Sequence, residues 1–287
     1  MKKKGLIYFH QGWTDIAIQL PLINHYAKQF DLIKVVVRHD AISFVKYYTR
    51  SLKNVEIVCL RDTVHGHDHH WEGPAFTNLG RDLSYLNIED IDSYDFLFHG
   101  QYDPRRKDQF RLVCRGNNPG GLTFYAEWFY ALYGIDFMTR IKDFSFERDK
   151  DLEEQVYQDF INLHGTKYVL YHDDPNYNNP HPSTRSRSSK INFQNKIQDC
   201  AYVNVNAKSE VFLDYIKVFE NAEEIHFIDS VWGCLYFQLD AKYKIFKDKT
   251  IYAHPLRGLP DYFTNPCSLP NWKIITPPLS RYIEHAG

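Results

Sequence analysis

The sequence of 287 residues contains no apolar run approaching the roughly 20 residues that a membrane-spanning helix needs. Its five cysteines are odd in number, scattered, and belong to no Cys-x-x-Cys motif, which argues against a disulfide framework and favours a reducing compartment. Lys2, Lys3 and Lys4 lead directly into a short apolar run without a small-residue cleavage site, so we expect no signal peptide. Together these absences predict a cytoplasmic protein.

An excess of charge of either sign is also missing. The 34 lysines and arginines nearly balance 36 aspartates and glutamates, giving a net charge of −2. Because non-specific binding to nucleic acid depends on positive charge that displaces counterions, we expect no nucleic-acid partner. Residues 105–111 are basic but include Asp108, which is typical of a solvated face; contact with an anionic glycan or lipid is the alternative.

The sequence lacks the usual spacings of metal ligands. Histidines occur at positions 65, 67, 69 and 70, and imidazoles bind zinc, but neither Cys-x-x-Cys nor His-Glu-x-x-His accompanies them. A polar surface loop is the simpler interpretation of residues 65–70. We therefore expect no metal and no resident cofactor.

What the sequence does contain is an alternation of short apolar runs and helical patterns. The first half predicts strands at 5–9, 32–37, 55–60 and 95–100, with helices at 15–28, 41–52 and 122–133. Thr14 or Asp15 is expected to cap the first helix, and Pro21 to kink or shorten it. This β-α-β-α-β order predicts a parallel, doubly wound sheet.

A second series of the same kind follows. It predicts a helix at 149–163, strands at 167–172, 201–205, 224–228 and 243–246, and helices at 209–220 and 230–239. The predicted fold class is therefore α/β, with two Rossmann-like domains facing a cleft. We assign residues 1–150 to an N-terminal acceptor domain and 151–287 to a C-terminal donor domain, with the tail from Pro255 packing back over the body.

Polar residues follow four of the predicted strands, where ligands bind in parallel α/β sheets. These segments are 10–15, 99–102, 172–174 and 229–230. In the first half they predict an acceptor-binding site made of His10, Gln11, Trp13, His99 and Gln101.

The turn that contains Gly12 and Asp15 has two interpretations. Asp15 either caps the helix, or acts as a general base on an acceptor hydroxyl with Trp13 as the floor of a sugar site. A single glycine does not make the G-x-G-x-x-G fingerprint, so a nicotinamide-dependent enzyme is disfavoured.

The second half offers candidate groups for binding a diphosphate. Asp229 and Ser230 precede a helix, whose first N–H groups and dipole attract anions, although an ordinary strand–cap–helix junction has the same pattern. The cations Arg185, Arg187 and Lys190 could stabilise a leaving diphosphate, or belong to a solvated loop.

Two of these stretches together resemble motifs of the heptosyltransferase-like glycosyltransferases. Residues 12–15, followed by an apolar stretch ending in Leu-Pro21, are similar to their small-residue turn with Gly-Asp and an apolar run ending in Leu-Pro. Asp229-Ser230 before a helix is similar to their Asp-Ser/Thr-Gly motif. Two residues separate Gly12 from the aspartate here, and Val231 replaces the family's second glycine, so the chain resembles a divergent member.

This resemblance to the ADP-heptose:lipopolysaccharide heptosyltransferase superfamily implies a GT-B fold with the donor in the C-terminal domain. It implies an inverting, metal-independent transfer of a sugar from a nucleotide sugar to the hydroxyl of a glycan or glycoconjugate. Asp15 would be the catalytic base. Donor contacts would come from Asp229, Ser230 and a basic residue such as Lys190.

Two alternatives stay open at this point. Asp173-Asp174 after a strand resembles the metal-binding carboxylate pair of GT-A glycosyltransferases, where carboxylate oxygens hold Mg²⁺ or Mn²⁺ on a diphosphate. The chain could also be a noncatalytic carbohydrate-binding protein.

Overall fold

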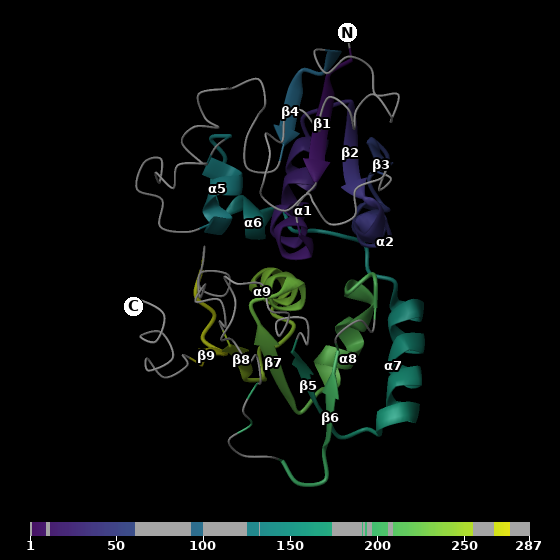
Figure 1. The fold of residues 1–287 in the computed structure, drawn as a ribbon, viewed down its shortest axis with the longest axis vertical. Coiled ribbons are helices and arrows are strands. Elements are labelled where there is room, and N and C mark those ends of the chain that lie inside the picture. Colours follow the sequence, from purple (N-terminus) through teal and green to yellow (C-terminus); the bar gives the residue numbers. More distant parts are fainter. Residues whose placement is uncertain are drawn as a thin grey trace, which may run out of the picture. The chain divides into compact units, whose positions relative to one another are not determined.

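The computed structural model describes residues 2–9, 12–60, 93–99, 125–131, 133–173, 191, 193, 197–205, 209–254 and 267–275. The chain divides into two compact units, Met1–Glu147 and Arg148–Gly287. Each unit is built on one parallel sheet, shown in Figure 1. No helix in the described part of the chain has the length and apolar character to cross a membrane.

The sheet of the first unit has the order β3-β2-β1-β4. Its strands are β1 (Lys4–Phe9), β2 (Leu32–Arg38), β3 (Val55–Leu60) and β4 (Phe96–His99), and every pairing is parallel. Buried apolar side chains fill β1 and the centre of β2, as expected for a sheet covered on both faces. The strands predicted for this unit are confirmed.

Helix α1 (Trp13–Ala27) connects β1 to β2, and a 3₁₀ turn, η1 (His39–Ala41), with α2 (Ile42–Thr49) connects β2 to β3. The helix α1 continues through the buried Pro21 as one element, so the prediction of a shortened first segment is wrong. Ten of its fifteen residues are buried, because packing in the unit holds the helix despite the proline.

Helices α5 (Tyr125–Ala131) and α6 (Thr139–Lys142) complete the described part of the first unit. The hydroxyl of Tyr130 donates to the carbonyl of Ile18 on α1 over 2.6 Å. Asn24 on α1 links three segments: its Nδ2 lies 2.7 Å from the hydroxyl of Tyr48 and donates to the carbonyls of Asp143 and Ser145 over 2.8 and 2.6 Å. These neutral hydrogen bonds join α1 to α2, to α5 and to the segment after α6, in a unit that also buries the charged Arg140 completely.

The sheet of the second unit has the order β6-β5-β7-β8-β9, again with every pairing parallel. Its strands are β5 (Tyr168–His172), β6 (Ala201–Asn204), β7 (Glu224–Ile228), β8 (Ile251–His254) and β9 (Trp272–Ile274). The helices are α7 (Lys150–His164), α8 (Ile216–Asn221) and α9 (Val231–Tyr243), with the 3₁₀ turn η6 (Leu213–Tyr215) before α8.

The helix predicted at 209–220 begins later than expected. Ser209 Oγ accepts hydrogen bonds from the backbone N–H groups of Val211 and Phe212, both over 3.0 Å. Phe212 has a φ of 62°, and the N–H of Leu213 bonds the carbonyl of Val211 over 2.7 Å, which closes a γ-turn. The serine's bonds to the backbone compete with helix formation, so the helix starts only after this turn.

The strand predicted at 243–246 is wrong. Helix α9 runs to Tyr243 and ends at Lys244 in the left-handed conformation. Asp240 then accepts a hydrogen bond from the N–H of Phe246 over 2.9 Å and another from the indole of Trp272 over 2.8 Å. The last strands are instead β8 and β9, neither of which was predicted.

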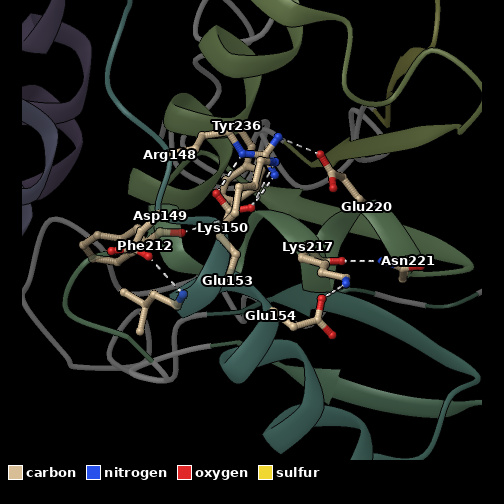
Figure 2. Close-up of polar contacts among 11 residues, drawn as sticks. Arg148, Asp149, Lys150, Glu153, Glu154, Phe212, Lys217, Glu220, Asn221 and Tyr236 are labelled. Atoms are coloured by element: carbon tan, nitrogen blue, oxygen red, sulfur yellow. Dashed lines mark hydrogen bonds and ion pairs between the residues drawn. The ribbon is translucent and has the colours of Figure 1, made fainter.

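The second unit also buries charge, as Figure 2 shows. Arg148 forms a two-pronged ion pair with Glu153, whose side chain is 1% exposed, and reaches Glu220 over 3.1 Å. Next to it Asp149 caps α7 by accepting from the N–H of Leu152 over 3.0 Å. This cluster fixes the start of the second unit to α7 and α8.

Candidate functional site

In each unit one position at the carboxyl edge of the sheet is a topological switch point. In the first unit the chain passes from β1 to β2 and β3 on one side, and then returns to place β4 on the other side of β1. Ligands of open α/β sheets bind where the strand order reverses in this way. The segments that leave β1 and β4 therefore flank the candidate site of this unit.

Asp15 lies at this switch point, in the first turn of α1. The N-cap is Gly12, with φ −63° and ψ 164° and no capping side chain, so the prediction that Thr14 or Asp15 caps the helix is wrong. The backbone carbonyl of Gly12 accepts from the N–H of Ile16 over 3.1 Å, which is the first hydrogen bond of the helix. The carboxylate of Asp15 lies back over the helix start: an added Cβ on Gly12 would be 3.8 Å from its Oδ2. This carboxylate is half-buried.

Trp13 is also half-buried and packs against Phe44 of α2, with ring centroids 6.3 Å apart. One side of its ring is thus used to join α1 and α2. His99 is the last residue of β4 and pairs with Tyr8 of β1, so its backbone lies at the switch point. The other predicted acceptor contacts, His10, Gln11 and Gln101, lie outside the described residues.

In the second unit the switch point lies between β5 and β7, because β6 and β8 extend the sheet in opposite directions. Asp173 follows β5, and its backbone exchanges two hydrogen bonds with the side-chain amide of Asn204 at the end of β6: N–H to Oδ1 over 3.3 Å and Nδ2 to carbonyl over 2.9 Å. Its predicted partner in a metal site, Asp174, lies outside the described residues. No cluster of metal-ligating side chains occurs among the residues described.

Asp229 and Ser230 follow β7 at the same switch point. Ser230 is the N-cap of α9, with its Oγ accepting from the N–H of Gly233 over 3.5 Å and its carbonyl accepting from Cys234 over 2.9 Å. Asp229 is fully buried, and Ser230 is 5% exposed. Direct contact of a ligand with the Asp229 carboxylate therefore needs a change in this junction, and the backbone at the start of α9 is the more available anion-binding feature. The predicted cations Arg185, Arg187 and Lys190 lie outside the described residues.

Sequence reasoning missed three polar features at the carboxyl edges. Arg38, which ends β2, forms two hydrogen bonds with the carboxylate of Asp40, over 3.1 and 2.6 Å. Asn204 holds the end of β5, as described above. His254 ends β8 and is 9% exposed. Each is a single residue without a motif, and the only signal in the sequence is its position directly after or at the end of an apolar run.

Comparisons with known proteins give the following result. No family model matches the sequence, and no curated protein matches it. Among solved structures, a family 9 glycosyl transferase from Veillonella parvula covers 96% of this chain and 86% of its own, with a TM-score of 0.50 and 9% identity. E. coli heptosyltransferase WaaC with ADP covers 96% and 93%, with a TM-score of 0.47 and 10% identity. The same enzyme with ADP-2-deoxy-2-fluoro heptose covers 95% and 92%, with a TM-score of 0.44 and 10% identity.

At 9% identity, the similarity to the Veillonella protein is one of fold. It extends over almost the whole of this chain, and thus over both parallel sheets. The predicted α/β fold of the GT-B type is confirmed, and the resemblance predicted from the motifs extends, at the level of fold, to a family 9 glycosyl transferase.

Proposed function

We propose that the protein is a glycosyltransferase that moves a sugar from a nucleotide sugar to a hydroxyl group of a glycan or glycoconjugate. The observation that carries this proposal is the half-buried carboxylate of Asp15 in the first turn of α1, at the switch point of the first sheet. The fold shared with a family 9 glycosyl transferase supports it.

In the proposed reaction Asp15 accepts the proton of the acceptor hydroxyl. The acceptor oxygen then attacks the anomeric carbon from the side opposite the nucleotide. The bond from that carbon to the phosphate oxygen breaks, and the nucleoside diphosphate leaves with the electron pair. One displacement of this kind inverts the configuration at the anomeric carbon.

The departing diphosphate carries negative charge, and the second unit offers groups that would stabilise it. The N-terminal end of α9 follows Ser230 and carries the positive end of the helix dipole. Arg185, Arg187 and Lys190 remain part of the proposal as the cations near the diphosphate. With these groups the transfer would proceed without a metal, using a donor domain from residue 151 to 287 and an acceptor domain from residue 1 to 150.

The test compares Asp15→Asn with the wild-type protein. Donor consumption is followed with a panel of uridine, adenosine, guanosine and cytidine nucleotide sugars, with and without candidate glycan acceptors. Loss of a general base should lower turnover roughly 100- to 10,000-fold while nucleotide binding persists. Asp151→Asn is the matched control, because it removes an exposed carboxylate from the first turn of α7. If Asp15→Asn retains wild-type turnover, Asp15 is not the base.

A metal-dependent transferase is the second candidate, since Asp173 lies at the switch point of the second sheet. In that case EDTA would abolish both turnover and the rise in melting temperature caused by a nucleotide, and Mn²⁺ would restore them. If glycans bind while no nucleotide raises the melting temperature, the protein is instead a carbohydrate-binding module. A nucleotide at about 100 times its Kd stabilises a protein by about 2.7 kcal/mol, which is easily detected.

A further inference from the structure

One face of the second sheet carries a row of polar and aromatic side chains. Tyr171 of β5, His226 of β7, Tyr252 of β8 and Lys273 of β9 are direct neighbours in the register of the strands. The ring of His226 stacks on Tyr252 with centroids 4.7 Å apart, and Phe193 meets its edge at 4.9 Å. A row of this kind is not needed to build an apolar core.

A chain of hydrogen bonds crosses this face from Glu224 to His254. Oε2 of Glu224 lies 3.3 Å from Nε2 of His226, and Nδ1 of His226 lies 3.1 Å from Nε2 of His254. Both histidines are almost fully buried, at 7% and 9% exposure. The three side chains therefore form one connected relay that ends at His254.

The relay determines which nitrogen of each ring carries its proton. Burial lowers the pKa of both histidines to about 4, so both rings are neutral at pH 7. The carboxylate of Glu224 accepts, so Nε2 of His226 carries a proton and Nδ1 of His226 is an acceptor. Nε2 of His254 must then donate, which leaves its Nδ1 as a bare lone pair.

That lone pair lies at the carboxyl edge of the sheet. His254 is the last residue of β8 and pairs with Ile228, two residues before the helix cap Ser230. No group in the described part of the chain hydrogen-bonds Nδ1 of His254. The diphosphate of a nucleotide sugar carries no proton at neutral pH and would be repelled by a lone pair, whereas a hydroxyl group would donate to it.

We propose that Nδ1 of His254 accepts a hydrogen bond from a hydroxyl group of the nucleotide-sugar donor, and that Glu224 and His226 are positioning residues that fix its tautomer. This assignment rests on the proposed function. The hydroxyl belongs either to the ribose or to the transferred sugar, and the start of α9 remains the place for the diphosphate.

Calorimetric titration tests the assignment. Wild-type protein and His254→Phe are titrated with ADP, UDP and GDP, then with the 2′- and 3′-deoxy forms of the nucleotide that binds, and with its nucleotide sugars. We expect His254→Phe to weaken binding of the ribonucleotide about 10-fold, and the matching deoxy form to bind both proteins equally. If the loss occurs only with nucleotide sugars, the hydroxyl belongs to the sugar.

Equal affinities of wild type and His254→Phe for nucleotides and nucleotide sugars would overturn this assignment and leave the proposed function intact. Absence of nucleotide binding by the wild-type protein would overturn both.

A second measurement needs no variant at His254. In ¹⁵N-labelled histidine spectra at pH 7, the wild-type protein should show both rings with the proton on Nε2, and the nucleotide should shift only Nδ1 of His254. Glu224→Leu should mix the tautomers and weaken binding, whereas Glu223→Leu, which removes the exposed neighbouring carboxylate, should do neither. Unchanged tautomers in Glu224→Leu would refute the positioning role.

Discussion

The two units have the same kind of sheet but bury their polar groups differently. In the first unit the central connection is neutral, with the amide of Asn24 bound to a hydroxyl and two carbonyls. In the second unit the corresponding connection is ionic, with Arg148 bound to Glu153 and Glu220. Since a buried ion that loses its partner is more costly than a buried amide that does so, loss of the Arg148 contacts should destabilise more than loss of the Asn24 contacts.

The starts of helices α1 and α9 also differ in how deeply their polar groups are buried. At α1 a glycine caps the helix, and Asp15 is half-buried. At α9 the hydroxyl of Ser230 is used in the cap, and the carboxylate of Asp229 is fully buried. Asp15, in the first turn of its helix, is the carboxylate that the proposed reaction uses, whereas Asp229 lies directly before its helix and is enclosed in the junction.

The largest expected effect is that of Arg148→Met. It leaves the carboxylate of Glu153, 1% exposed, without its main partner, which should cost about 3 kcal/mol in the free energy of unfolding. Asn24→Leu in the first unit should cost about 2 kcal/mol, through the loss of hydrogen bonds to buried carbonyls. Urea titrations of both variants measure the two losses.

The double variant Arg148→Met, Glu153→Leu is the control for this contrast. It removes the stranded carboxylate, so it should recover much of the loss. An equal loss in the single and double variants would mean that Arg148 contributes through packing and not through charge.

The second effect is a loss of stability in acid. The pKa of His226 and of His254 is lowered to about 4 by burial, against about 6.5 for an exposed histidine. The unfolded chain therefore binds protons first, so stability is fully present above pH 6.5 and is lost as the pH falls from 6.5 toward 4. Between pH 7 and 5 each ring should contribute a loss of about 2 kcal/mol.

In the first unit the group to compare is the carboxylate of Asp143, which titrates at a lower pH than the two histidines of the second unit. Burial alone would raise the pKa of Asp143, but hydrogen bonds from Lys28 and His25 outweigh it and lower this pKa. Its contribution is therefore lost only below the usual range of an aspartate. Hydrogen exchange at pH 7 and 5, corrected for the intrinsic rate, should show earlier opening in peptides of β7 and β8 than in those of α1. The reverse order would contradict the contrast between the units.

The sequence allowed much of the fold to be predicted, because buried parallel strands are short apolar runs between polar turns. The prediction failed where contacts between residues far apart in the sequence determine the structure. Residues 243–246 have a strand-like pattern, yet α9 extends to Tyr243, and Asp240 binds the backbone of Phe246. Strand β9 has only three residues, and its position depends on β8 and on the bond from Trp272 to Asp240. No local pattern contains this information.

The candidate site was predicted in outline for the same reason. Strand order is enough to bring the ends of β1, β5 and β7 to carboxyl edges, so Asp15 and Ser230 could be selected from the sequence. The burial of Asp229 and the relay ending at His254 could not, since both depend on which face of the sheet a side chain meets. The Gly12 cap was missed because side-chain caps are the commoner choice.

A smaller effect tests the cap of the second helix. Ser230→Ala removes the oxygen that accepts from the N–H of Gly233 and should cost about 1 kcal/mol of stability. Because this bond is long, at 3.5 Å, the loss should not exceed this value. Thermal unfolding measures it, with Ser230→Thr as the control that retains a hydroxyl. If alanine and threonine are equally stable, the hydroxyl does not cap α9.

The smallest effect on stability, and the sharpest contrast with activity, is expected for Gly12→Ser. The backbone of Gly12 is in the extended region that serine adopts freely, and an added Cβ would lie 3.8 Å from Oδ2 of Asp15, which is ordinary contact. A serine cap should therefore stabilise α1 by only a few tenths of a kcal/mol. Its hydroxyl, however, would lie beside the carboxylate that we propose as the base and would donate to it. We expect a protein that melts at the same temperature or slightly higher but transfers sugar more slowly, whereas Gly12→Ala should leave the rate nearly unchanged. Equal rates for the serine and alanine variants would separate the carboxylate of Asp15 from the reaction, and the start of α1 would then have a structural role alone.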